Sequence, residues 1–148
     1  MSLLRVRDLD VSFTTYGRRT QVLHGVSLDV PAGAQVALVG ESGSGKSVTM
    51  KAIMGLLPQP PASIEAGTIH FDGDDLLTMR ERDRLKLRGT AMSMVFQDPM
   101  SSLNPVFTIM DQLGTILKYA DRRLGRARGR KGRVARVQEV LAQVRMRD

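Results

Sequence analysis

The chain of 148 residues suits a single domain, and it carries a formal net charge of +7 with an isoelectric point of about 10.5. Cysteine is absent, which excludes disulfides, thiolate metal sites and cysteine nucleophiles. Residues 1–8 are charged too early for a secretory signal, and no apolar run approaches the ~20 residues of a membrane span, so we expect a soluble or peripheral protein.

Three or four strands are expected before residue 40. Apolar residues between positions 4 and 13 alternate imperfectly and predict one strand or a pair of short ones. Residues 22–30 predict a second strand, whose clean alternation over 26–30 indicates one polar face. The continuous apolar run 34–39 predicts a strand buried in a sheet.

Helices and further strands are expected after residue 40, separated by turn-forming residues. We predict helices over residues 47–56, 80–88, 108–119 and 134–144, the last from apolar residues at helical spacing. We predict strands over residues 68–71 and 91–96, a tight turn over 72–75 and a loop over 97–105.

Residues 40–47, Gly-Glu-Ser-Gly-Ser-Gly-Lys-Ser, match the phosphate-binding pattern G-x-x-x-x-G-K-[ST] at every fixed position. A strand-like run leads into them and a helix-compatible run leads out, which is the setting that this pattern requires. The alternative is a glycine-rich turn with no ligand, and the coincidence of the full pattern with its context disfavours it.

The residue types in this loop suit phosphate chemistry. Gly40, Gly43 and Gly45 lack a Cβ, so the backbone can close on an anion with its N–H groups pointing inward. The helix that follows places the positive end of its dipole at the same point. Lys46 supplies a full positive charge for the outer phosphates, and the Ser47 hydroxyl can ligate Mg²⁺.

The order of motifs resembles the ATP-binding subunit of an ATP-binding-cassette (ABC) transporter. The resemblance rests on Tyr16, the phosphate loop, the stretch Gly-Thr-Ile-His-Phe-Asp-Gly at 67–73 and Phe-Gln-Asp-Pro at 96–99. The segment 40–49 together with Phe-Gln-Asp-Pro-Met-Ser-Ser-Leu-Asn-Pro at 96–105 is more particular. It is similar to the branch that imports oligopeptides, dipeptides or nickel.

The resemblance implies roles for individual residues. Tyr16 would stack on adenine, where a partly buried surface tyrosine is the alternative. Gln97 would act as a sensor that contacts Mg²⁺ or the attacking water, where a loop glutamine bonded to backbone is the alternative. The implied ATP contacts are Tyr16, Gly40, Glu41, Ser42, Gly43, Ser44, Gly45, Lys46, Ser47 and Val48, and the implied Mg²⁺ ligands are Ser47 and Gln97.

The implied fold class is α/β, with a P-loop NTPase core of the ABC ATPase type. We expect an antiparallel β layer near the N-terminus and the start of a helical subdomain. Residues 1–97 would form the nucleotide-binding core, and residues 98–148 the exit of the glutamine loop and an incomplete helical subdomain.

The sequence departs from the family pattern after Gln97. It contains no serine–glycine–glycine signature, no run of four apolar residues ending in Asp-Glu and no switch histidine. We therefore expect a truncated domain whose catalytic set is incomplete, because the groups that hold Mg²⁺ and polarise water are lost. Its sheet would also lack the strands that flank the phosphate-loop strand.

No other residues suggest a metal site. His24 and His70, the only histidines, lack partners at metal-ligand spacing. The acidic residues Asp72, Asp74 and Asp75 are better explained as a solvated turn, because the family pattern places a hairpin there.

The basic charge is concentrated in the last part of the chain. Residues 118–148 contain 11 basic and 3 acidic residues, whereas residues 1–117 contain 11 and 12. The arginine-rich stretch 122–133 could neutralise nucleic-acid phosphates. No aromatic residue interleaves this stretch and no recognition motif is present, so a solvated linker is favoured and no direct nucleic-acid partner is expected.

We therefore predict the N-terminal part of an ABC importer's ATP-binding subunit, coupling ATP binding and hydrolysis to uptake of peptides or a related solute such as nickel. Its partners would be membrane-spanning permease subunits and a second ATP-binding subunit. It would be peripheral at the cytoplasmic face of the inner membrane, held through the permease rather than through lipid. The alternatives are an inactive fragment that binds ATP without hydrolysis, a small P-loop kinase or regulator, and a nucleic-acid-binding protein.

Overall fold

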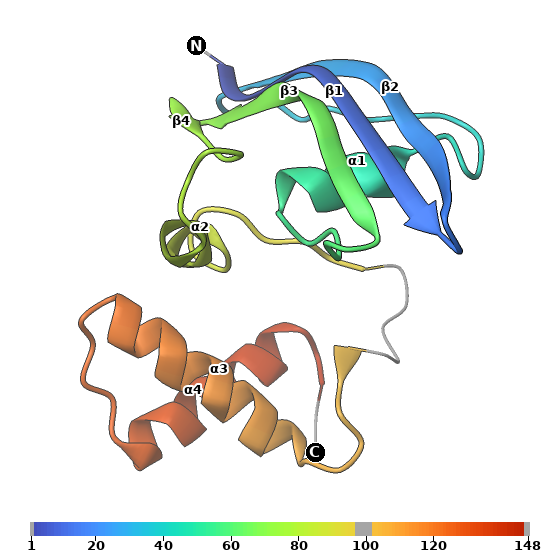
Figure 1. The fold of residues 1–148 in the computed structure, drawn as a ribbon. Coiled ribbons are helices and arrows are strands. Elements are labelled where there is room, and N and C mark those ends of the chain that lie inside the picture. Colours follow the sequence, from blue (N-terminus) through green and yellow to red (C-terminus); the bar gives the residue numbers. More distant parts are fainter. Residues whose placement is uncertain (1, 97–101, 147–148) are drawn as a thin grey trace. The chain divides into compact units, whose positions relative to one another are not determined.

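The computed structural model describes residues 2–96 and 102–146, which fall into two compact units, Met1–Arg88 and Gly89–Asp148 (Figure 1). The boundary predicted from the sequence, between residues 97 and 98, falls at residues outside the described ranges. In the described part of the chain, no helix has the length and apolar character needed to cross a membrane.

The first unit is built on an antiparallel sheet of four strands in the order β2-β1-β3-β4. The strands are β1 (Ser2–Thr15), β2 (Arg18–Pro31), β3 (Ala62–Phe71) and β4 (Asp74–Asp75). The predicted N-terminal antiparallel layer is thus confirmed. Its longest strands extend beyond the segments expected from alternation, because each pairs along its length with a neighbour.

One face of this sheet carries the core. Val6, Leu9, Val11, Leu23 and Ile69 are completely or almost completely buried. They come from three strands that are adjacent in the sheet. Alternation places Leu9 and Val11 on the same face, and a bulge between Arg7 and Asp10 brings Val6 to that face as well. Burial of these side chains supplies the main driving force for forming the unit.

A bulge in β1 explains why the predicted alternation is imperfect. The pairing of β1 with β3 shifts register between Arg7 and Asp10, and Asp8 adopts a positive φ of 45° within this step. Opposite it, Gly67 has a φ of +100°, and a Cβ there would lie 2.6 Å from the Arg7 carbonyl oxygen. Only glycine allows the two strands to approach this closely.

Helix α1 (Lys46–Ile53) lies against the sheet (Figure 1). Its side chains Thr49, Ala52 and Ile53 are buried. The short helix α2 (Glu81–Leu87) follows the β3–β4 hairpin and confirms the predicted charged helix. Just after it, Arg88 donates from Nε to the carbonyl oxygen of Met54 and from Nη2 to that of Gly55, both at 2.8 Å. It therefore satisfies carbonyl groups at the C-terminal end of α1.

The second unit is a helical hairpin of α3 (Ile109–Arg123) and α4 (Arg130–Gln143), as the sequence predicts. Thr108 caps α3 by accepting a hydrogen bond from the backbone N–H of Asp111 at 3.1 Å. Near the other end of α3, the buried Asp121 pairs with Arg128 of the α3–α4 connection at 3.0 Å. Val137 of α4 is fully buried in this hairpin.

Two predicted strands are wrong. Residues 34–39 form an exposed segment without strand structure, in which the side chain of Val39 is 88% exposed. Residues 91–96 make only an isolated bridge at Met92, and Val95 is 95% exposed. A strand exists only where its backbone pairs with at least one neighbouring strand, and among the described residues neither segment pairs with one.

Candidate phosphate-binding site

The glycine-rich motif forms the loop that leads into α1. Gly43 and Gly45 adopt positive φ angles of 83° and 89°, and Gly45 is the residue from which the helix begins. Residues 41–44 are exposed, so their backbone faces solvent around the N-terminus of the helix. The motif residues therefore form an exposed loop that leads directly into the N-terminus of a helix.

The Lys46 side chain is folded back over the loop that precedes it. Its Nζ donates to the carbonyl oxygen of Gly40 at 2.7 Å, to that of Glu41, and to the Ser44 hydroxyl at 3.2 Å. The ammonium group therefore lies over the concave side of the loop, where a phosphate oxygen would compete for the same donors.

Two glycines fix the shape of the loop by close contact. A Cβ at Gly45 would lie 2.5 Å from Cδ2 of Leu23, a core residue of β2. A Cβ at Gly40 would lie 2.8 Å from the Ser44 hydroxyl oxygen. Gly45 thus packs the start of the helix closely against β2, and Gly40 packs closely against Ser44 within the loop. Both positions therefore exclude larger residues.

Helix α1 holds the remaining motif residues in place. Ser47 is exposed in its first turn, beside the half-buried Val48. The buried Thr49 donates its hydroxyl proton to the carbonyl oxygen of Gly45 at 3.0 Å. This bond ties the first turn to the glycine that starts it, and pattern matching alone did not assign it.

Ser47 is suitably placed to ligate magnesium. Ser47 is exposed and directly follows Lys46 at the N-terminus of the helix. Its hydroxyl is an oxygen ligand, the type that Mg²⁺ prefers when it bridges phosphates. Among residues 2–96 and 102–146, no cluster of three or more histidine or acidic side chains could hold a metal ion by itself. The residues present therefore fit a magnesium ion that arrives with a nucleotide.

The other two predicted site residues lie outside the motif in the sequence. Tyr16 lies in the turn between β1 and β2, with a φ of 50° and a fully exposed ring. Such a ring is available for stacking, although no hydrogen bond joins it to the loop in the described part of the chain. Gln97 lies outside the described residues.

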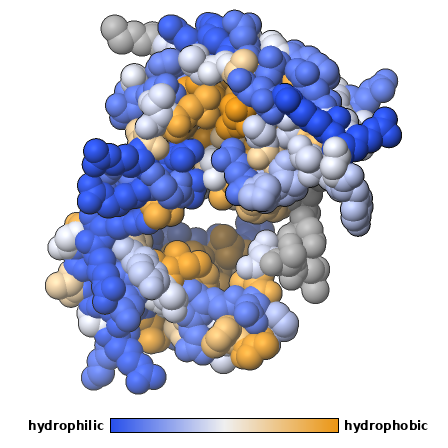
Figure 2. Space-filling view, viewed as in Figure 1, coloured by the Kyte–Doolittle hydropathy of each residue, from blue (hydrophilic) through white to orange (hydrophobic). Residues whose placement is uncertain are grey.

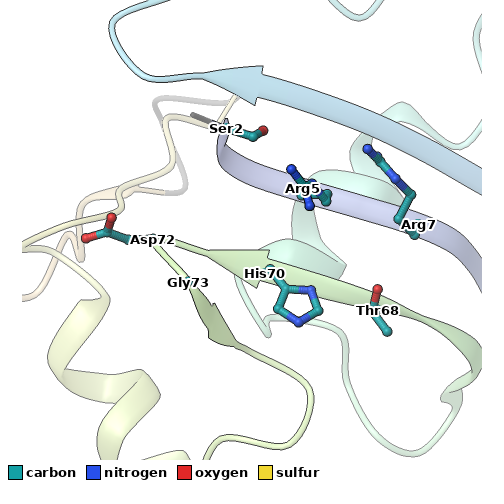
Figure 3. Close-up of a pocket in the computed structure, with 7 residues that line it drawn as sticks. All are labelled: Ser2, Arg5, Arg7, Thr68, His70, Asp72 and Gly73. Atoms are coloured by element: carbon teal, nitrogen blue, oxygen red, sulfur yellow. The ribbon is translucent and has the colours of Figure 1, made fainter.

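The acidic turn joins β3 to β4, and His70 lies on β3. Asp72 and Gly73 have positive φ angles and form the β3–β4 turn, as the sequence predicts. A cavity of about 700 Å³ on the outer sheet face is lined by Ser2, Arg5, Arg7, Thr68, His70, Asp72 and Gly73 (Figure 3).

Beside this cavity, Asp29 of β2 pairs with Arg7 and, at 3.4 Å, with Arg5 of β1. The hydrogen bond from Arg7, supported by those from Ser2 and Arg5, holds the pKa of Asp29 below its usual value. The Ser12 hydroxyl similarly lowers the pKa of Glu65 on β3. These carboxylates join strands, so we assign them a structural role.

Comparison with known proteins identifies the family. The family model described as ABC transporter matches residues 23–148. The chain belongs to the ABC transporter ATP-binding family. This confirms the resemblance drawn from the motifs and the α/β fold class of the ABC ATPase core that it implied.

Curated ABC relatives agree with the peptide branch. The dipeptide transport ATP-binding protein DppD of Bacillus subtilis is 50% identical over 115 residues, which are 78% of this chain and 34% of that protein. The oligopeptide transport ATP-binding protein OppD of the same organism is 47% identical over 78% of this chain and 32% of its own length. The peptidoglycan transport ATP-binding protein YejF of Agrobacterium fabrum is 48% identical over 99% of this chain and 26% of its own length.

The chain thus spans about a quarter to a third of the length of these ABC relatives. Among solved structures, the ATP-binding cassette MJ0796, in a dimeric post-hydrolysis state bound to ADP and Pi, matches with a TM-score of 0.76. The match covers 98% of this chain and 58% of that one at 21% identity, and it supports the fold alone.

Proposed function

We propose that this chain binds MgATP through residues 40–48 and acts as the nucleotide-binding part of a peptide importer. The observation that carries the proposal is the glycine-rich loop at the start of α1, in which the Lys46 ammonium lies against the carbonyl oxygens of Gly40 and Glu41. Relatives named for oligopeptide and dipeptide transport favour peptides over nickel as the class of solute.

In this proposal each residue contacts a different part of the nucleotide. The loop amides and Lys46 hold the phosphates, Ser47 ligates the magnesium ion, and Tyr16 stacks on the base. Gln97 senses the metal or the attacking water. The printed sequence has no apolar run ending in Asp-Glu, so we expect these 148 residues alone to bind MgATP without appreciable turnover.

We further propose that the chain works beside permease subunits and a second ATP-binding subunit at the cytoplasmic face of the inner membrane. The relatives are named as transport ATP-binding proteins, which supports this assignment. Loss of the gene should then reduce uptake of labelled dipeptides or oligopeptides. Loss of nickel uptake with unchanged peptide uptake would contradict the peptide assignment.

Calorimetric titration with MgATP tests the binding site directly. We expect Lys46→Ala to abolish the binding that the unmodified chain shows, because the variant loses the cation above the loop. Lys51→Ala is the matched control, since it removes a lysine from the last turn of the same helix. Absence of binding by the folded unmodified chain, or equal loss in both variants, would contradict the proposed site.

A further inference from the structure

The connection between α3 and α4 has an unusual charge. From Arg122 to Gln138 the sequence contains eight basic residues and no acidic residue. In the structure, residues 124–129 form an exposed connection between α3 and α4, and the flanking basic residues lie at the adjoining helix ends. On the side of the second unit where this connection lies, the visible surface is mainly hydrophilic (Figure 2).

Part of this charge serves the hairpin itself. Arg128 pairs with the buried Asp121, and the backbone carbonyl of Arg128 accepts a hydrogen bond from Arg133. Arg136 pairs with Glu139 within α4 at 2.7 Å. These three arginines therefore have structural partners and are not needed to explain an interaction surface.

The remaining charge is turned outward. Arg122, Arg126, Arg130 and Lys131 are exposed, and they form no ion pair with any residue in the described ranges. Neighbouring cations repel one another, and Arg130 and Lys131 also stand at the positive end of the α4 dipole, where no acidic residue compensates them. An anionic partner would relieve this repulsion.

One of these outward cations, Arg130, also lines a small cavity of the hairpin. The cavity has a volume of about 210 Å³ between α3 and α4, and its lining includes Lys118, Arg130 and Arg133. Asp111 also lines it, with its carboxylate already accepting a hydrogen bond from the Thr108 hydroxyl. Three cations and one carboxylate give this cavity a net positive charge.

Apolar side chains are exposed beside the cations. Tyr119 on α3 is 59% exposed, and Leu124, which directly follows α3, is 55% exposed. They alternate with Lys118, Arg122 and Arg126 along the chain. Basic and apolar side chains intermixed at the surface are typical of segments that lie in the headgroup region of a membrane.

We propose that this basic hairpin end, residues 118–131, binds the anionic headgroups of a lipid bilayer. Its cations would contact lipid phosphates while Tyr119 and Leu124 enter the headgroup boundary. Lipid is favoured over nucleic acid because the exposed apolar residues gain from burial in lipid. The inference relies on the proposed function only for placing the chain beside a membrane, and it adds a direct lipid contact to the contact through permease subunits.

Vesicle binding by the full chain tests this inference. We compare vesicles of phosphatidylcholine with vesicles that also contain phosphatidylglycerol, without nucleotide. The triple variant Arg126→Gln, Arg130→Gln, Lys131→Gln should bind the anionic vesicles on the order of 100-fold more weakly, since each cation near such a surface contributes about 1 kcal/mol. The matched control, Arg18→Gln, Arg80→Gln, Arg82→Gln, removes the same charge from the first unit and should bind as the unmodified chain does.

A second variant separates lipid from nucleic acid. Tyr119→Ser with Leu124→Ser should weaken binding to anionic vesicles roughly tenfold and leave binding to a DNA duplex unchanged. Equal loss in both triple variants, equal binding to neutral vesicles, or no vesicle binding would overturn the inference. Tight DNA binding with vesicle binding insensitive to the serine variant would overturn it in favour of nucleic acid.

Parallel MgATP calorimetry keeps the two proposals apart. Because the triple variant leaves residues 40–48 unchanged, it should retain the MgATP binding of the unmodified chain. Vesicle binding by a chain that fails to bind MgATP would remove the proposed nucleotide function and leave the lipid contact standing.

Discussion

Arg88 donates to the carbonyl oxygen of Met54, so a side chain that follows α2 closes the C-terminal end of α1. A second nitrogen bonds Gly55, and a third pairs with Glu81 at 2.9 Å. The helix that begins at the phosphate loop is therefore held at both ends by distant parts of the unit. At the N-terminal end of α1, Gly45 contacts Leu23, and at the C-terminal end the Arg88 guanidinium group bonds the carbonyl groups.

We predict that Arg88→Ala destabilises the first unit by about 1–3 kcal/mol, because carbonyl groups at the end of α1 lose a charged donor. Arg88→Lys should recover only part of this stability, since a single ammonium cannot reproduce the three contacts of the planar guanidinium group. Urea unfolding measures the change, with the exposed Arg82→Ala on α2 as the control. Equal stability of the Arg88→Ala and Arg82→Ala variants would exclude the cap.

Gly45→Ala should both destabilise the chain and abolish MgATP binding. The φ of +89° costs any L-residue about 1–2 kcal/mol, and the contact with Leu23 adds to that cost. Gly43→Ala isolates the cost of positive φ, since a Cβ there would meet nothing within 4 Å.

A double variant, Gly45→Ala with Leu23→Ala, tests the steric contact. If the clash is real, the cost of Gly45→Ala measured by urea unfolding is smaller in the Leu23→Ala background. An additive result would mean that the loop relaxes without pressing on β2.

Arg128→Ala should destabilise the helical hairpin by about 1–3 kcal/mol, because it leaves the buried Asp121 carboxylate without its cation. The partial exposure of Arg128 keeps the cost below that of a fully buried pair. Hydrogen exchange of the α3 and α4 amides measures the effect locally. Arg126→Ala is the control, and Asp121→Asn with Arg128→Gln should cost less than Arg128→Ala alone.

Acid should weaken the β1–β2 pairing through Asp29. Because the pKa of this carboxyl is lowered in the folded protein, its contribution to stability is present above the ordinary value of 3.8. That contribution is lost as pH falls through the lower folded-state value. Asp29→Asn should therefore reduce stability at neutral pH and flatten its dependence on acid, as followed by thermal unfolding. Equal loss of stability at neutral pH in Asp29→Asn and in the exposed turn variant Asp72→Asn would contradict this role of Asp29.

Tyr16→Ala should weaken MgATP binding roughly tenfold, a loss typical of removing one aromatic stacking partner from a base. Tyr16→Phe should bind normally, because the ring face is kept. Since the ring is fully exposed, neither variant should change stability. Inorganic triphosphate provides the control ligand, and equal weakening of triphosphate and MgATP by Tyr16→Ala would contradict stacking.

Local patterns predicted local structure well. The alternation in β1 and β2, the turn at Asp72 and Gly73, and the spacing that forms α4 each depend on residues close in sequence. The motif at residues 40–47 is likewise continuous in sequence, and the helix expected after it begins at Lys46.

The wrong predictions concern segments that depend on distant partners. Residues 34–39 and 91–96 are apolar enough for buried strands, but a strand also needs neighbours, and its own sequence does not reveal whether they exist. For the same reason the sequence does not predict the hydrogen bond from Arg88 to Met54 or the ion pair of Asp121 with Arg128. Both interactions join residues that only the fold brings together.

The folded-back Lys46 makes nucleotide binding an exchange rather than a simple addition. A phosphate must displace the carbonyl oxygens of Gly40 and Glu41 from the ammonium group before it gains that charge. The measured affinity then reports the difference between two sets of hydrogen bonds, one internal and one to the ligand. The internal set also keeps the Lys46 ammonium hydrogen-bonded within the loop when no ligand is bound.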